Sequence, residues 1–178
     1  KDILTFIGNK YHNKSVLTLR GEFEALSDED IARFLIARNG DVEKARVMLQ
    51  EHIKWREDYP WPIYKEECLG ELHKGKVYLH GEDKDGHPLV VFRPAKNDMD
   101  IRDVGEMGRM ALWWTDVIFK SIPSHLSKVT LLVNRLGGEN NADVPFIRAF
   151  TSVMQSNYPE RLHKAIIYPS GWIFWGLW

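Results

Sequence analysis

The sequence predicts an α/β fold in which a helical N-terminal annex precedes a mostly parallel sheet flanked by helices. Three observations lead to this fold class. Apolar residues recur at helical spacing in residues 27–62. The period then changes, and short apolar runs typical of strands follow. These runs alternate with amphipathic stretches, which is the order expected of a parallel sheet connected by helices.

The annex is predicted to hold two helices joined by a tight turn. Ser27 is a hydroxyl cap, and the acidic residues after it face the positive end of the helix dipole. The pair Asn39-Gly40 ends this helix because both residues tolerate the left-handed conformation. Asp41 caps the second helix, which ends before Pro60. Residues 1–26, which precede the annex, are weakly patterned and stay unassigned.

Residues 63–178 form the predicted sheet domain, which opens with a β-hairpin. Two β-type runs, 76–80 and 89–93, flank the charged turn sequence 82–86. Glycine and aspartate in this turn supply the conformations that a hairpin connection needs.

Two helix–strand units follow the hairpin. The first is an amphipathic helix over 103–121 and a continuous apolar run at 129–133. The second begins at Asp143, stops at Pro159, and leads into an apolar run at 165–168. Because helices connect the last three strands, we expect those strands to be parallel with right-handed crossovers.

Composition narrows the function classes. The 24 basic and 25 acidic residues give a net charge of −1, so no bulk field favours nucleic acid. Cys68 is the single cysteine, which excludes an internal disulfide and fits a reducing compartment. No run approaches the ~20 apolar residues of a membrane span, and the first residues are not a signal peptide. We therefore predict a protein of the cytoplasm or another intracellular reducing compartment.

No motif predicts catalysis. Cys68 lies beside Glu66 and Glu67, whose charges would raise the pKa of its thiol, which is the opposite of what a nucleophile needs. Ser170 follows a strand, but the Gly-x-Ser-x-Gly motif is not formed. We predict a protein that is not an enzyme and has no catalytic residue.

Metal and cofactor motifs are also lacking. His73, His80 and His87 are evenly spaced, but they fall on a loop, a strand and a turn, whereas zinc sites use short-spaced pairs. The sequence Asp83-x-Asp85-Gly86 has the start of a calcium loop without its remaining ligands, so a hairpin turn explains it better. Neither a metal nor a cofactor is predicted.

Four segments, in this order along the chain, carry a resemblance to a known family. They read arginine-phenylalanine-leucine-x-alanine-arginine at 33–38, lysine-tryptophan-arginine at 54–56, aspartate-x-x-glycine-x-proline at 83–88, and tyrosine-proline-glutamate-arginine-leucine at 158–162. Together they resemble the CRAL-TRIO (Sec14-like) lipid-binding domain. The domain normally continues past a residue like Trp178, so it would be C-terminally incomplete here.

The resemblance implies a lipid carrier. Such a protein binds and transfers one hydrophobic lipid in an apolar cleft without catalysis, the lipid being a phospholipid, such as the phosphatidylinositol of some members, or an isoprenoid-like molecule. A carrier of this kind would be peripheral to membranes. Two family positions differ here, since an aspartate is replaced by Asn134 and an asparagine by Tyr168. The alternative is a structural or interaction subunit that keeps the fold inside a larger assembly without exchanging lipid.

Candidate lipid contacts are alternate residues on one face of each strand, together with apolar residues of the last helix and the C-terminal segment. Asn134 and Tyr168 supply the polar groups at the cleft mouth. The full set is Val90, Phe92, Leu132, Asn134, Phe150, Met154, Ile166, Tyr168 and Phe174.

Two further groups have alternative interpretations. Arg33 and Arg38 form either surface ion pairs or, as the resemblance implies, contacts that tie the annex to the lipid domain. Trp172, Trp175 and Trp178 belong to an apolar segment without a polar face, which predicts that something covers it. A partner protein is favoured over a membrane surface because no basic face lies alongside.

Overall fold

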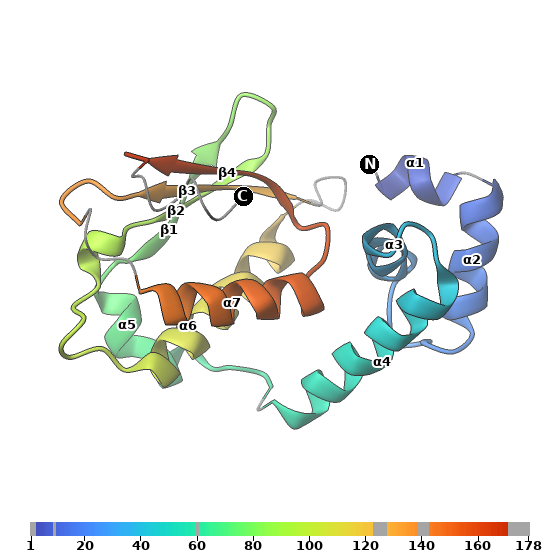
Figure 1. Cartoon of the computed structure of the whole chain (residues 1–178), viewed down its shortest axis with the longest axis horizontal. Coiled ribbons are helices and arrows are strands. Elements are labelled where there is room, and N and C mark those ends of the chain that lie inside the picture. The colour runs from blue at the N-terminus through green and yellow to red at the C-terminus, as the bar shows by residue number, and fades with distance from the viewer. Residues whose placement is uncertain (1–2, 9, 60, 123–127, 139–142, 171–178) are drawn as a thin grey trace. The chain divides into compact units, whose positions relative to one another are not determined.

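The computed structural model describes residues 3–8, 10–59, 61–122, 128–138 and 143–170. The chain divides into two compact units, of which the first comprises 1–61 with 153–160 and the second 62–152 with 161–178. Figure 1 shows the helices of the first unit in blue and cyan and the sheet of the second in green to red.

The first unit is helical. Its caps are those that the sequence predicts, because the Ser27 side chain accepts a hydrogen bond from the amide of Asp30, and Asp41 accepts one from the amide of Lys44. Residues 1–26, unassigned from sequence, also form helices. Its elements are α1 (Ile3–Gly8), α2 (Lys10–Arg20), α3 (Asp28–Ala37) and α4 (Val42–Asp58).

Apolar side chains from all four of these helices form one core. Leu19, Ile31, Leu35 and Leu49 are completely buried in it. Burying a leucine or isoleucine side chain stabilises a fold by about 1.5–3 kcal/mol, so this helical unit holds a core of its own.

The second unit contains a four-stranded sheet in the order β1-β2-β3-β4. β1 and β2 form the predicted hairpin and are antiparallel, while β2, β3 and β4 are parallel. Its elements are η1 (Lys65–Cys68), α5 (Leu69–His73), β1 (Val77–Glu82), β2 (Pro88–Phe92), η2 (Pro94–Lys96), α6 (Val104–Ser121), β3 (Val129–Asn134), α7 (Val144–Asn157, whose last residues belong to the first unit) and β4 (Leu162–Tyr168).

The connections place the helices on one side of the sheet. β2, β3 and β4 succeed each other in the same direction, and right-handed crossovers therefore put α6 and the start of α7 on the same face. Figure 1 shows α5, α6 and the start of α7 below the sheet. Val90 of β2 and Val129 of β3 pack there against Ile118 of α6.

Candidate functional site

The sheet has two chemically different faces, which the strand register defines. Side chains of paired residues point to the same face, and successive side chains alternate. The packed face carries Val90 and Leu131, which lie against α6. We call the other side the open face, and its residues are Tyr78, Leu89, Val91, Thr130, Leu132, Asn134, Lys164, Ile166 and Tyr168.

An apolar row crosses the middle of the open face. Tyr78, Val91, Leu132 and Ile166 are register partners on β1, β2, β3 and β4. Neighbouring strands lie about 4.8 Å apart, so the row spans about 14 Å. Tyr78 is partly buried, and exposure then rises from 2% for Val91 to 43% for Ile166. Among the described residues of this unit, no helix covers the row (Figure 1).

A polar row lies at the carboxyl edge, where β3 and β4 end. Asn134 and Tyr168 are register partners there, and Tyr168 is 60% exposed. The Asn134 side-chain oxygen accepts a hydrogen bond from the amide of Leu136 at 3.1 Å. Its amide nitrogen, a donor, is therefore the group that can contact a ligand. The buried Arg135 holds the ends of the two strands together by donating to the Pro169 carbonyl at 2.9 Å.

A second polar row lies at the amino edge and is occupied by the hairpin turn. The Thr130 hydroxyl donates to Asp83 at 2.5 Å, and the Lys164 ammonium donates to Asp85 at 2.8 Å. The Thr130 hydroxyl, together with the backbone amides of His87 and Asp85, lowers the pKa of Asp83 to about 2. The open face is thus an apolar row between one exposed polar row and one polar row covered by the turn.

Comparison with known proteins identifies the family. A model of the CRAL/TRIO domain matches residues 72–178. The chain belongs to the CRAL/TRIO domain family. The resemblance that the four sequence motifs carry is therefore confirmed.

Relatives of this CRAL/TRIO chain include proteins named for lipid transfer. The chain is 26% identical to phosphatidylinositol transfer protein CSR1 of Eremothecium gossypii, over 85% of this chain and 38% of that protein. It is 30% identical to phosphatidylinositol/phosphatidylcholine transfer protein SFH4 of Arabidopsis thaliana, over 82% of this chain and 28% of that protein. The chain thus spans well under half the length of these relatives.

The crystal structure of Sfh5 shares the fold. It has a TM-score of 0.67 and 13% sequence identity, with 96% of this chain and 74% of that one covered. The predicted α/β class is confirmed.

The six strand residues predicted to contact lipid do not share one face of the sheet. Val90 and Phe92 pair with Leu131 and Val133, and so lie on the packed face, opposite Leu132. Val90 is buried against Ile118. The five residues of β2 are apolar or proline throughout, so the sequence held no sign of which of them face α6. The register groups Leu132, Asn134, Ile166 and Tyr168 on the open face.

The other predicted lipid contacts do not belong to the open face. Phe150 belongs to α7, whose start lies on the other side of the sheet (Figure 1), and its ring stacks on Phe146 with centroids 6.0 Å apart. Met154 is half-buried and belongs to the first unit. Phe174 and the three C-terminal tryptophans, Trp172, Trp175 and Trp178, lie outside the described residues.

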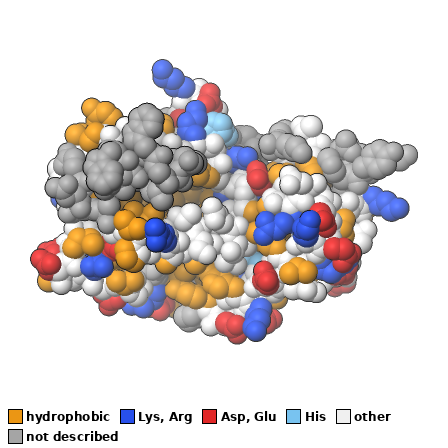
Figure 2. Space-filling view, viewed as in Figure 1, with side chains coloured by type: hydrophobic (Ala, Val, Ile, Leu, Met, Phe, Trp, Pro, Cys, Tyr) orange, Lys and Arg blue, Asp and Glu red, His pale blue; other side chains and the backbone are white. Residues whose placement is uncertain are grey.

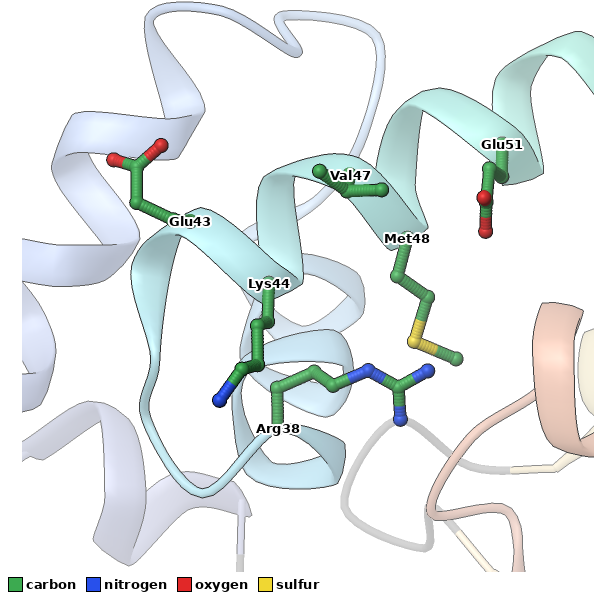
Figure 3. Close-up of a pocket in the computed structure, with 6 residues that line it drawn as sticks. All are labelled: Arg38, Glu43, Lys44, Val47, Met48 and Glu51. Atoms are coloured by element: carbon green, nitrogen blue, oxygen red, sulfur yellow. The ribbon is translucent and has the colours of Figure 1, made fainter.

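The two annex arginines differ in their exposure and in the residues around them. Arg33 is 6% exposed and pairs with Asp30 of the same helix at 2.8 Å. Burial lowers its pKa, and Asp30 partly offsets that effect. Arg38 lines a groove of about 340 Å³ on α3 and α4, shown in Figure 3. Its charged lining residues, of both signs, suit a polar surface and not a lipid chain; the lining is Arg38, Glu43, Lys44, Val47, Met48 and Glu51.

A buried ion pair, which sequence analysis missed, supports the sheet. Lys76 and Glu71 are completely buried and pair with each other, and Lys76 also donates to Asn97 at 2.7 Å. Glu71 accepts from Lys74 at 2.5 Å as well. Glu71 pairs with both Lys74 and Lys76 inside the unit, so we assign this group to the joining of α5, β1 and the loop after β2 and not to a ligand site.

The remaining reactive groups have structural explanations. Cys68 is buried, and its pKa is raised mainly by that burial and then by Glu106, so its thiol stays protonated. Asp83, Asp85 and His163 form the one group of the described residues with metal-ligand spacing, their ligand atoms lying within 4.8 Å of one another. Lys164 already neutralises Asp85, so we assign this group to the hairpin contact. No helix among the described residues is long and apolar enough to cross a bilayer.

Proposed function

We propose that this chain binds one lipid molecule on the open face and carries it between membranes without catalysing a reaction. The observation that carries the proposal is the apolar row Tyr78–Val91–Leu132–Ile166, which lies between two polar rows on the side of the sheet away from α6. The relatives named as phosphatidylinositol transfer proteins support a glycerophospholipid as the ligand.

The driving force is the removal of acyl chains from water. Each Å² of apolar surface buried contributes about 25 cal/mol, so a chain lying over Leu132 and Ile166 replaces the contacts that it leaves in the bilayer. Because Ile166 is 43% exposed, the row has apolar surface left for a ligand to cover.

The lipid headgroup belongs at the carboxyl edge. Tyr168 presents an exposed hydroxyl and Asn134 an amide donor, and both are groups that bind phosphate or ester oxygens. The chains then run from this edge onto the apolar row. No bond is made or broken, so exchange requires affinity and access but no catalytic residue.

The proposal also covers the location of the protein in the cell and the surfaces that it contacts. We infer an intracellular protein peripheral to membranes, with Trp172, Trp175 and Trp178 meeting a partner protein or, during exchange, a bilayer. We propose that Arg33 and Arg38 stabilise the annex, Arg33 through its ion pair with Asp30.

Lipid extraction and vesicle transfer test the proposal together. The purified protein should carry one lipid per chain in native mass spectrometry. It should also move a fluorescent phosphatidylinositol or phosphatidylcholine from donor to acceptor vesicles. A protein that holds no lipid and transfers none to any acceptor would instead favour the interaction subunit.

A further inference from the structure

The hairpin turn between β1 and β2 lies over the open face at its amino edge. Figure 1 shows this turn, in green, on the side of the sheet away from α6 and α7. The pairing of β1 with β2 shifts between Leu79 and Glu82, and Gly81 there has φ +59°, a conformation that favours glycine. Such an irregularity bends the strand, which lets the turn reach beyond its own two strands.

Two aspartates fasten the turn to the neighbouring strands. Asp83 accepts the Thr130 hydroxyl of β3 at 2.5 Å and the backbone amides of Asp85 and His87 at 2.9 Å each. Asp85 reaches one strand further and accepts from Lys164 of β4 at 2.8 Å. Thr130 and Lys164 are register partners, so the turn bridges both strands in one row of the open face.

Two histidine rings and the burial of Thr130 also belong to the contact between the turn and the strands. The imidazoles of His87 and His163 lie with their centroids 3.9 Å apart, which closes the space between the turn and β4. Thr130 is completely buried beneath the turn. A lipid chain that entered this row would separate Thr130 from Asp83 and leave the buried Thr130 hydroxyl without this acceptor, which is costly.

We propose that the turn 83–87 is an end wall of the lipid site and limits the length of chain that the site accepts. The inference rests on the proposed function, because it assumes that a chain lies on the apolar row. A chain that starts at the exposed carboxyl edge can extend until it meets the wall, and further methylenes stay in water. Asp83 fixes the wall to β3 and Asp85 fixes it to β4.

The test measures affinity against chain length. Lysophosphatidylcholines of increasing saturated chain length are titrated into the parent protein and into the double variant Thr130→Val, Asp85→Ala. In the parent, affinity should rise about fourfold per added methylene and then stop rising at one length. In the double variant the rise should continue to longer chains. Lys84→Ala, which changes an exposed residue of the same turn, is the matched control and should keep the parent's limit.

The outcomes separate the two proposals. If the parent binds the series and the double variant stops at the same length, the wall is wrong and the lipid site stands. A parent whose affinity never levels off also overturns the wall. A parent that binds no member of the series overturns the proposed function and the wall with it. Should the double variant fail to fold, Asp85→Ala alone is tested, because it alters only an exposed carboxylate. Its affinity should also keep rising past the parent's limiting chain length, by fewer methylenes than in the double variant.

Discussion

The two faces of the sheet are built from alternate residues of the same strands, yet they differ in what lies on them. On the packed face of β4, Ala165 and Ile167 are partly buried. On the open face, Ile166 and Tyr168 are 43% and 60% exposed. Figure 2 shows that hydrophobic side chains remain visible on the surface beside Lys and Arg. The difference teaches that crossover handedness, and not apolar content, selects which face becomes core.

The first prediction compares one substitution on each side of the sheet. Ile118→Ala should lower the free energy of unfolding by about 2–5 kcal/mol, because it leaves a cavity between α6 and the strands. Ile166→Ala should lower it by less than about 1 kcal/mol, because that side chain is only partly buried. Urea denaturation of both variants measures the contrast. Equal losses would mean that the open face is also core.

The second prediction concerns lipid binding. Ile166→Asp should lower lipid affinity more than about tenfold, because a lipid chain would have to cover a carboxylate in place of an apolar side chain. Vesicle transfer by the variant should fall accordingly. Leu162→Asp is the control, since Leu162 is similarly exposed at 47% on the same strand but pairs with Val129 of the packed face, ahead of a register shift between Val129 and Thr130.

Each outcome of this comparison has a clear consequence. If both aspartate variants transfer lipid as the parent does, the apolar row is not the binding surface. If both variants lose lipid transfer equally, the effect comes from damage to β4. The proposal that the apolar row binds lipid is then not supported. Circular dichroism of both variants checks that β4 survives the change.

Local patterns were enough to predict the elements and their ends. Ser27 and Asp41 cap helices because their oxygens accept amide hydrogens within three residues, and such signals lie within a short stretch of chain. The same holds for the stop at Pro159 and for the hairpin. The assignment of faces was beyond reach, because β2 is apolar on both sides and only the pairing register separates Val90 from Val91.

Long-range polar contacts were also beyond sequence reasoning. Asp85 and Lys164 are 79 positions apart, and nothing near either residue indicates the other. Lys76 is completely buried with Glu71, although lysine side chains are seldom fully buried and no neighbouring residue in the sequence indicates it. The motifs that carry the family resemblance predicted the fold, whereas the wall depends on a strand irregularity at Gly81 that only the structure shows.

The third prediction tests the carboxyl edge of the open face. Tyr168→Phe removes one hydroxyl and should weaken phospholipid binding by about two- to tenfold, the range expected for one hydrogen bond. Tyr64→Phe is the matched control, because Tyr64 is equally exposed at 61% but lies beside η1. Titration with one defined phospholipid measures both. An unchanged affinity for Tyr168→Phe would move the headgroup away from this edge.

The smallest effect concerns pH and the hairpin wall. The pKa of Asp83 is lowered to about 2, chiefly by the Thr130 hydroxyl. A carboxyl whose pKa is depressed on folding stabilises the fold above its unfolded pKa of about 3.9, and this contribution is lost as pH falls. The wall should therefore hold its contact to β3 at neutral pH and lose it gradually from about pH 4 to pH 2.

A site-specific titration checks this, because Asp85 also has a lowered pKa, caused first by Lys164 and then by His163. The carboxyl carbon of Asp83, followed by NMR, should titrate near pH 2 in the parent and move toward its ordinary range in Thr130→Val. Amide exchange of His87 should speed up over the same pH interval, since that amide donates to Asp83. An Asp83 carboxyl that titrates alike in parent and variant would show that Thr130 does not hold the turn. The proposed end wall would then have no contact to β3.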